Sequence, residues 1–164
     1  MTLLNRLIVI AAVLSPAAIG LNALAQTPVT QKAICVHIGS SQREALDRVG
    51  HTLEEVPYSC RSEGGPFDDA VQTGTTTYEW DGLKGTVLAG NGIARKPGGT
   101  QVFQVTEGTI TLLMTDGKVT GFTTAGKGVV KLATGNGAMQ NGKTFTYTAH
   151  PVSAVAFVLE TTYD

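Results

Sequence analysis

Two dipeptides in the second half of the chain, Asp116–Gly117 and Asn141–Gly142, constrain the fold most strongly. A two-residue hairpin turn of type I′ needs a positive φ at both central positions, and Asp-Gly and Asn-Gly adopt it most readily. Strand-like segments rich in Thr and apolar residues flank Asp116–Gly117, and after Asn141–Gly142 Thr alternates with aromatic residues. This pattern predicts antiparallel strands that are connected in sequence order.

Similar strand-like segments recur over most of the chain. In residues 32–38 apolar side chains alternate in position, so that residues 34, 36 and 38 share one face while Cys35 and His37 share the other. Glu107–Gly108 is expected to be a further turn between two strands. We count about eight or nine strands, including those expected at residues 32–38, 51–56, 75–80, 85–95, 101–106, 109–115, 143–150 and 153–161.

One segment after residue 25 has a helical pattern. Ser40 or Ser41 could cap a short helix over residues 43–49, which Gly50 would end. Pro57 is expected to stop the strand that precedes it, and residues 58–73 are expected to form a long loop because they are polar and rich in turn-forming residues.

The expected strands form an up-and-down meander, and an open meander leaves unpaired backbone groups on its first and last strands. Closing the sheet removes these edges. Glycines recur within the expected strands, as at 90, 92, 126 and 128, where they favour bulges and curvature. The sequence therefore predicts an all-β, closed or nearly closed barrel in preference to a sandwich. Its outline is that of lipocalin-like, avidin-like and allene-oxide-cyclase-like barrels, an analogy of fold that does not fix function.

The first 25 residues have the three parts of a secretory signal peptide. Arg6 supplies the positive charge, residues 7–14 are uninterruptedly apolar, and Ala23–Leu24–Ala25 places small residues before the expected cleavage at Ala25–Gln26. Eight apolar residues are too few to span a bilayer, which needs about 20. We expect a single barrel domain over residues 26–164 in the periplasm or the extracellular medium, not inserted in a membrane after the signal is removed.

The charge of the mature chain gives no reason to expect nucleic acid or an anionic membrane as a partner. The whole chain has a formal charge of −1, and the loss of Arg6 with the signal peptide makes it −2. Proteins that bind polyanions carry basic patches or an excess of positive charge, which the mature chain lacks.

Cys35 and Cys60 are the only cysteines in the chain. An even number of cysteines in an exported protein favours a structural disulfide. Such a bond would stabilise the fold by roughly 3 kcal/mol on the chain-entropy model. The alternatives are a redox-active pair, which is usually Cys-x-x-Cys, and a zinc site, which would need further ligands at recognisable spacing.

The aromatic residues could line a cavity inside the barrel, since small-molecule pockets combine aromatic walls with a few polar groups. The residues available for ligand binding are Tyr78, Trp80, Phe103, Phe145, Tyr147 and Phe157.

The same cavity could hold a catalytic group. His37 or His51 could serve as a general base, and Glu79 or Arg61 could orient a substrate. The simpler interpretation of Glu79 is a solvent-facing side chain, with its neighbours Tyr78 and Trp80 facing the core.

The sequence contains no clear motif for binding a nucleotide cofactor or a metal ion. The three Gly-x-Gly segments do not open helices, as a phosphate-binding loop requires. The three histidines, His37, His51 and His150, lack local metal-ligand spacing. No cofactor and no metal site is expected.

Three functions remain open. The first is an exported barrel that binds a small, largely apolar molecule. The second is a cofactor-free enzyme of isomerase, cyclase or lyase type that uses the same cavity. The third is an envelope interaction or inhibitor module that presents its loops. The sequence leaves the ligand, the oligomeric state and the presence of catalysis undetermined.

Overall fold

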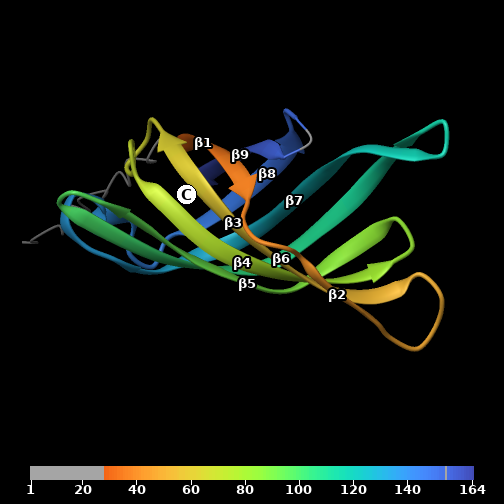
Figure 1. The fold of residues 1–164 in the computed structure, drawn as a ribbon. Helices are drawn as coiled ribbons and strands as arrows, with labels where there is room; N and C mark the ends of the chain where they lie inside the picture. The colour runs from red at the N-terminus through yellow and green to blue at the C-terminus, as the bar shows by residue number, and fades with distance from the viewer. Residues whose placement is uncertain (1–27, 154) are drawn as a thin grey trace, which may run out of the picture.

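A computed structural model describes residues 28–153 and 155–164, so the expected signal peptide lies outside the described residues. Eight antiparallel strands close into a barrel, and one short additional strand pairs at its edge (Figure 1). In chain order the elements are β1 (Val29–His37), β2 (Gln42–Ala45), β3 (His51–Glu63), β4 (Val71–Asp81), β5 (Lys84–Lys96), β6 (Gly99–Thr115), β7 (Lys118–Ala133), the 3₁₀ helix η1 (Gly135–Gln140), β8 (Thr144–Pro151) and β9 (Ala156–Tyr163).

The predicted closed meander is confirmed. From β3 to β9 each strand pairs with the next one in sequence, and β1 lies between β9 and β3. The seam between β1 and β3 closes the barrel and runs from Lys32 opposite Glu63 to His37 opposite Tyr58. A closed barrel leaves no long unpaired edge.

The predicted helix over residues 43–49 is wrong. Residues 42–45 form β2, which pairs with β3 from Gln42 opposite Glu55 to Ala45 opposite Thr52. Strand β2 continues the pairing of β1 along β3 after an irregular connection, and β3 offers it a complete ladder of backbone partners. Those hydrogen bonds outweigh a weak helical pattern that has no second element to pack against.

The predicted loop over residues 58–73 is largely strand. Pro57 lies within β3, and the loop between β3 and β4 is confined to residues 64–70. The Pro57 carbonyl accepts a hydrogen bond of 3.1 Å from the Ile38 N–H, in the irregular connection between β1 and β2. The missing N–H of Pro57 therefore faces a break in the ladder, which is where a strand tolerates proline.

Of the three predicted turns, one forms as predicted and the other two do not. Asp116 and Gly117 have φ values of 50° and 74° and connect β6 directly to β7, as predicted. Asn141 has a φ of −59°, because the connection from β7 to β8 passes through η1 instead of a two-residue turn. Glu107 and Gly108 lie inside the long strand β6, next to a register shift against β7, and do not turn the chain.

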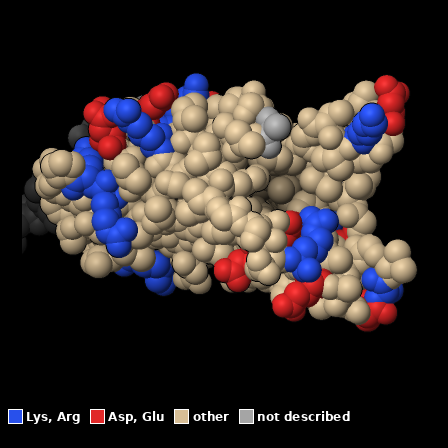
Figure 2. All heavy atoms as spheres, in the orientation of Figure 1, with Lys and Arg blue, Asp and Glu red and all other residues tan. Residues whose placement is uncertain are grey.

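One end of the barrel is filled by side chains. Phe67, in the loop between β3 and β4, is fully buried. The buried Gln31 amide donates a hydrogen bond of 3.0 Å to Ser62, and its oxygen accepts one of 3.1 Å from the Phe67 N–H. Strand β2 lies at the other end of β3. Figure 2 shows that the charged side chains on the visible face gather towards the two ends of the barrel.

Candidate functional site

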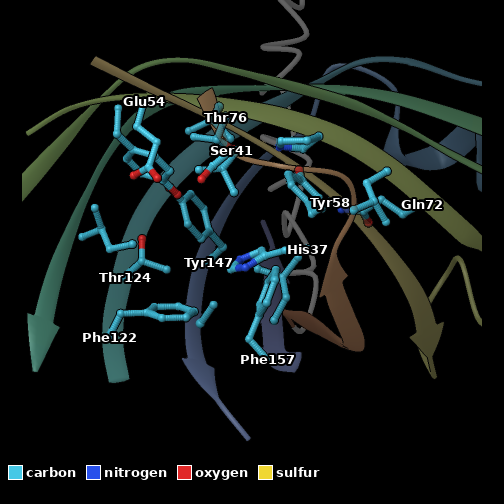
Figure 3. Close-up of a pocket in the computed structure, with 18 of the residues that line it drawn as sticks. His37, Ser41, Glu54, Tyr58, Gln72, Thr76, Phe122, Thr124, Tyr147 and Phe157 are labelled. Atoms are coloured by element: carbon cyan, nitrogen blue, oxygen red, sulfur yellow. The ribbon is translucent and has the colours of Figure 1, made fainter. Parts of the chain in front are cut away.

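The barrel interior contains a partly open cavity of about 400 Å³. Seven of the eight barrel strands contribute side chains to its lining, and so does the connection between β1 and β2. All six aromatic residues singled out from the sequence lie in this lining: Tyr78, Trp80, Phe103, Phe145, Tyr147 and Phe157. Figure 3 shows part of the cavity wall, with Tyr147 lying in this view between Glu54 and His37.

Glycines on neighbouring strands make room for the aromatic rings of the wall. A Cβ atom at Gly92 on β5 would overlap the Phe103 ring and would lie 2.7 Å from the Thr73 carbonyl oxygen. A Cβ atom at Gly128 on β7 would likewise overlap the Phe145 ring. The rings therefore lie flat against the wall instead of filling the interior. The sequence predicted curvature at these glycines, whereas the structure shows that they also accommodate side chains.

Tyr58, Tyr78 and Tyr147 contribute hydroxyl groups to the polar part of the cavity lining. Burial raises the pKa of Tyr58 to about 12, although hydrogen bonding to Gln72 acts in the opposite direction. Burial likewise raises the pKa of Tyr78 and of Tyr147. All three tyrosines are therefore protonated at neutral pH, and their hydroxyl groups can donate hydrogen bonds to a ligand oxygen.

The cavity contains one ion pair. Arg43 Nη2 on β2 donates to Glu54 Oε2 on β3 at 2.6 Å. The Glu54 side chain is 11% exposed, whereas that of Arg43 is 49% exposed. The Arg43 guanidinium also lies 5.4 Å from the centre of the Trp80 ring, within the range of a cation–π interaction.

His37 is the one predicted catalytic residue that lines the cavity. Its ring centre lies 5.2 Å from that of Phe157 and 6.5 Å from that of Phe122. Burial lowers the pKa of His37, and the charge of Glu54 opposes this effect. A lowered pKa keeps the imidazole neutral at neutral pH, so that it could accept a proton.

The structure brings His51 and Glu79 together, but they do not line the cavity. His51 Nε2 lies 2.8 Å from Glu79 Oε1, and its other ring nitrogen contacts Asp47. Hydrogen bonds to Asp47, which has the larger effect, and to Glu79 raise the pKa of His51. Arg61 is also outside the cavity lining and pairs with Asp69 at 2.8 Å. These contacts form ion pairs at the surface and bring no group into the interior.

Glu54, Arg43 and Tyr58 line the cavity but were not predicted from the sequence. Two of them could have been found from strand periodicity, because a disulfide at Cys60 predicts an inward-facing side chain there. Counting back by two along a continuous strand then places Tyr58 and Glu54 on the same inner face. The assumption that Pro57 ends the strand concealed this relationship.

Over residues 28–153 and 155–164, His, Cys, Asp and Glu side chains form no group of three or more that could hold a metal ion. The same residues include no helix long and apolar enough to span a membrane. No protein-family model, no curated protein and no solved structure matches the chain.

Proposed function

We propose that this chain is an exported binding protein whose barrel interior holds a small molecule with a largely apolar body. The observation that carries the proposal is the cavity of about 400 Å³. Small-molecule pockets typically have volumes of about 300–1,000 Å³ and combine apolar walls with a few polar groups. The six aromatic rings would hold the apolar body, and the tyrosine hydroxyl groups would orient a polar atom.

The disulfide supports the proposed export to the periplasm or the extracellular medium. Cys35 and Cys60 are bonded to each other, and no free cysteine is present among the described residues. Disulfides form and persist in oxidising compartments.

Binding can be tested with the only tryptophan of the chain. Trp80 lines the cavity, so a ligand that enters should change its fluorescence and raise the melting temperature. We expect both signals for at least one compound in a broad set of small apolar and aromatic metabolites. The variant Trp80→Phe should keep the thermal shift and lose the fluorescence change. Absence of both signals across the whole set would contradict the proposal.

A second candidate is a cofactor-free isomerase, cyclase or lyase. The observation that favours it is that His37, Glu54 and the tyrosine hydroxyl groups line one cavity. A neutral imidazole could remove a proton, and protonated tyrosines could stabilise negative charge that develops on an oxygen atom. If a ligand found in the binding test is converted to product, His37→Gln should lower kcat much more than it changes affinity. An unchanged ligand after prolonged incubation would favour binding alone.

The hollow interior gives less support to an interaction or inhibitor module. Eight strands can form a barrel that side chains fill completely, and such a barrel would leave only its loops for function. A binding surface on the loops does not require a cavity lined by tyrosine hydroxyl groups inside the barrel.

A further inference from the structure

Arg43, Glu54 and Trp80 form a cation-binding arrangement within the cavity wall. The Arg43 guanidinium lies 2.6 Å from the Glu54 carboxylate and 5.4 Å from the centre of the Trp80 ring. The Tyr78 ring centre is 5.8 Å from that of Trp80, which extends the aromatic surface. A carboxylate combined with aromatic faces is a favourable environment for an organic cation.

Glu54 and Trp80 lie on strands of the barrel, whereas Arg43 lies on a short strand at its edge. Glu54 and Trp80 belong to β3 and β4, long barrel strands that pair with each other from His51 opposite Asp81 to Arg61 opposite Val71. Arg43 belongs to the four-residue β2, which pairs with β3 alone and whose residues are all exposed.

The connection that carries β2 is irregular. It includes Gly39, which has a φ of 69° and no atom within 4 Å of a Cβ built on it. The segment that carries Arg43 is exposed, and its connection to β1 has open space around Gly39, which is typical of segments that open locally at low free energy.

The Glu54 carboxylate needs a positive partner, because an unpaired charge in a largely buried position is strongly unfavourable. Among the described residues that line the cavity, Arg43 is the only Lys or Arg. A ligand that binds next to Glu54 can satisfy this requirement by supplying its own cation, and Arg43 can then move into solvent. An anionic ligand would instead place a second negative charge beside Glu54.

We propose that the ligand of this cavity is an organic cation, a substituted ammonium or guanidinium group on an apolar body, which displaces Arg43 from Glu54 and Trp80. This inference rests on the proposed binding function and specifies its ligand class. The cationic group would contact the Glu54 carboxylate and the Trp80 ring, and the apolar body would lie among the aromatic rings deeper in the barrel. In the free protein, Arg43 occupies the position of the ligand cation.

A matched series of probes tests the ligand class. Isothermal titration calorimetry on the mature protein would compare 4-phenylbutyltrimethylammonium, 4-phenylbutan-1-ol and 4-phenylbutanoate, which share one apolar body. We expect the ammonium compound to bind at least about tenfold more tightly than the alcohol, and the carboxylate to bind most weakly. Equal binding of all three would overturn the inference and leave the proposed binding function intact. Failure of the ammonium compound to bind would overturn the inference whatever the metabolite screen shows.

The binding affinities of variants show whether the ligand displaces Arg43 or whether the Arg43–Glu54 pair only stabilises the fold. Arg43→Met should bind the ammonium compound several-fold more tightly, because the competing cation is gone. Glu54→Gln should bind the ammonium compound and the alcohol about equally. If Glu54→Gln does not fold, Trp80→Leu should also reduce the preference for the ammonium compound. Arg61→Met breaks the surface pair with Asp69 and serves as the control that changes no affinity. Weaker ammonium binding by Arg43→Met, or tightest binding of the carboxylate by the unaltered protein, would overturn the inference.

Discussion

Cys35 on β1 and Cys60 on β3 lie directly opposite each other at the seam that closes the barrel, with their Cα atoms 3.9 Å apart. Their disulfide covalently joins the two strands whose pairing converts the sheet into a barrel. Both side chains are buried and pack with Ala33, Ala149 and Phe157 in one core cluster.

Reduction of this disulfide should destabilise the protein by about 3 kcal/mol, the value expected for a loop of this length. The measurement is urea unfolding with and without a thiol reductant. The double variant Cys35→Ala/Cys60→Ala controls for other effects of the reductant, since the chain has no further cysteines. An unchanged unfolding midpoint in both comparisons would show that backbone pairing alone holds the seam.

Glycine at position 92 should be necessary for the position of the Phe103 ring. The variant Gly92→Ala should lower the free energy of unfolding by about 1–3 kcal/mol, as overpacking does in other cores. Gly121→Ala is the matched control, because its Cβ would meet the Pro151 ring at 3.0 Å and the end of the Leu113 side chain at 3.8 Å, and no aromatic ring. The effect should shrink when Phe103→Leu is combined with Gly92→Ala. Equal stability of Gly92→Ala and Gly121→Ala would contradict this account of the wall.

Tyrosine ionisation should report the burial of the cavity wall. The chain has four tyrosines, and burial raises the pKa of each, that of Tyr58 to about 12. In the unfolded chain they ionise near pH 10. Above that pH the unfolded state releases phenolic protons that the folded state retains, so stability should fall as the pH rises above about 10.

Ultraviolet difference absorbance can follow this ionisation directly. In the native protein little tyrosinate should form near pH 10, whereas in the urea-unfolded protein all four tyrosines should ionise with a midpoint near pH 10. If two or more tyrosines ionise near pH 10 while the circular dichroism remains native, the hydroxyl groups are in contact with solvent and the proposed enclosure is wrong.

The closed barrel could be predicted because its signals are local. The turn at Asp116–Gly117 and the alternation of residues along each strand depend on neighbouring residues alone. Six of the aromatic residues that line the cavity were predicted from the same kind of local pattern. The disulfide followed from the number of cysteines and the expected export.

The polar part of the cavity could not be predicted in the same way. Arg43 reaches Glu54 because the chain leaves the β1–β3 ladder after His37 and rejoins β3 at Gln42, a break that depends on tertiary pairing. His51 and Glu79 are close in space only because β3 and β4 pair in one particular register. Helix propensity over residues 43–49 was a misleading local signal, since β3 provided backbone partners that an isolated helix lacks.

Native mass spectrometry of the protein, purified without denaturant from the cells that produce it, tests the binding function most directly. We predict an additional bound mass that is released on unfolding. Thr161→Phe on β9, which places a ring in the cavity, should remove this mass, and Thr162→Phe on the outer face of the same strand should retain it. A single ligand-free mass in every preparation, together with no thermal shift in the metabolite set, would contradict the account.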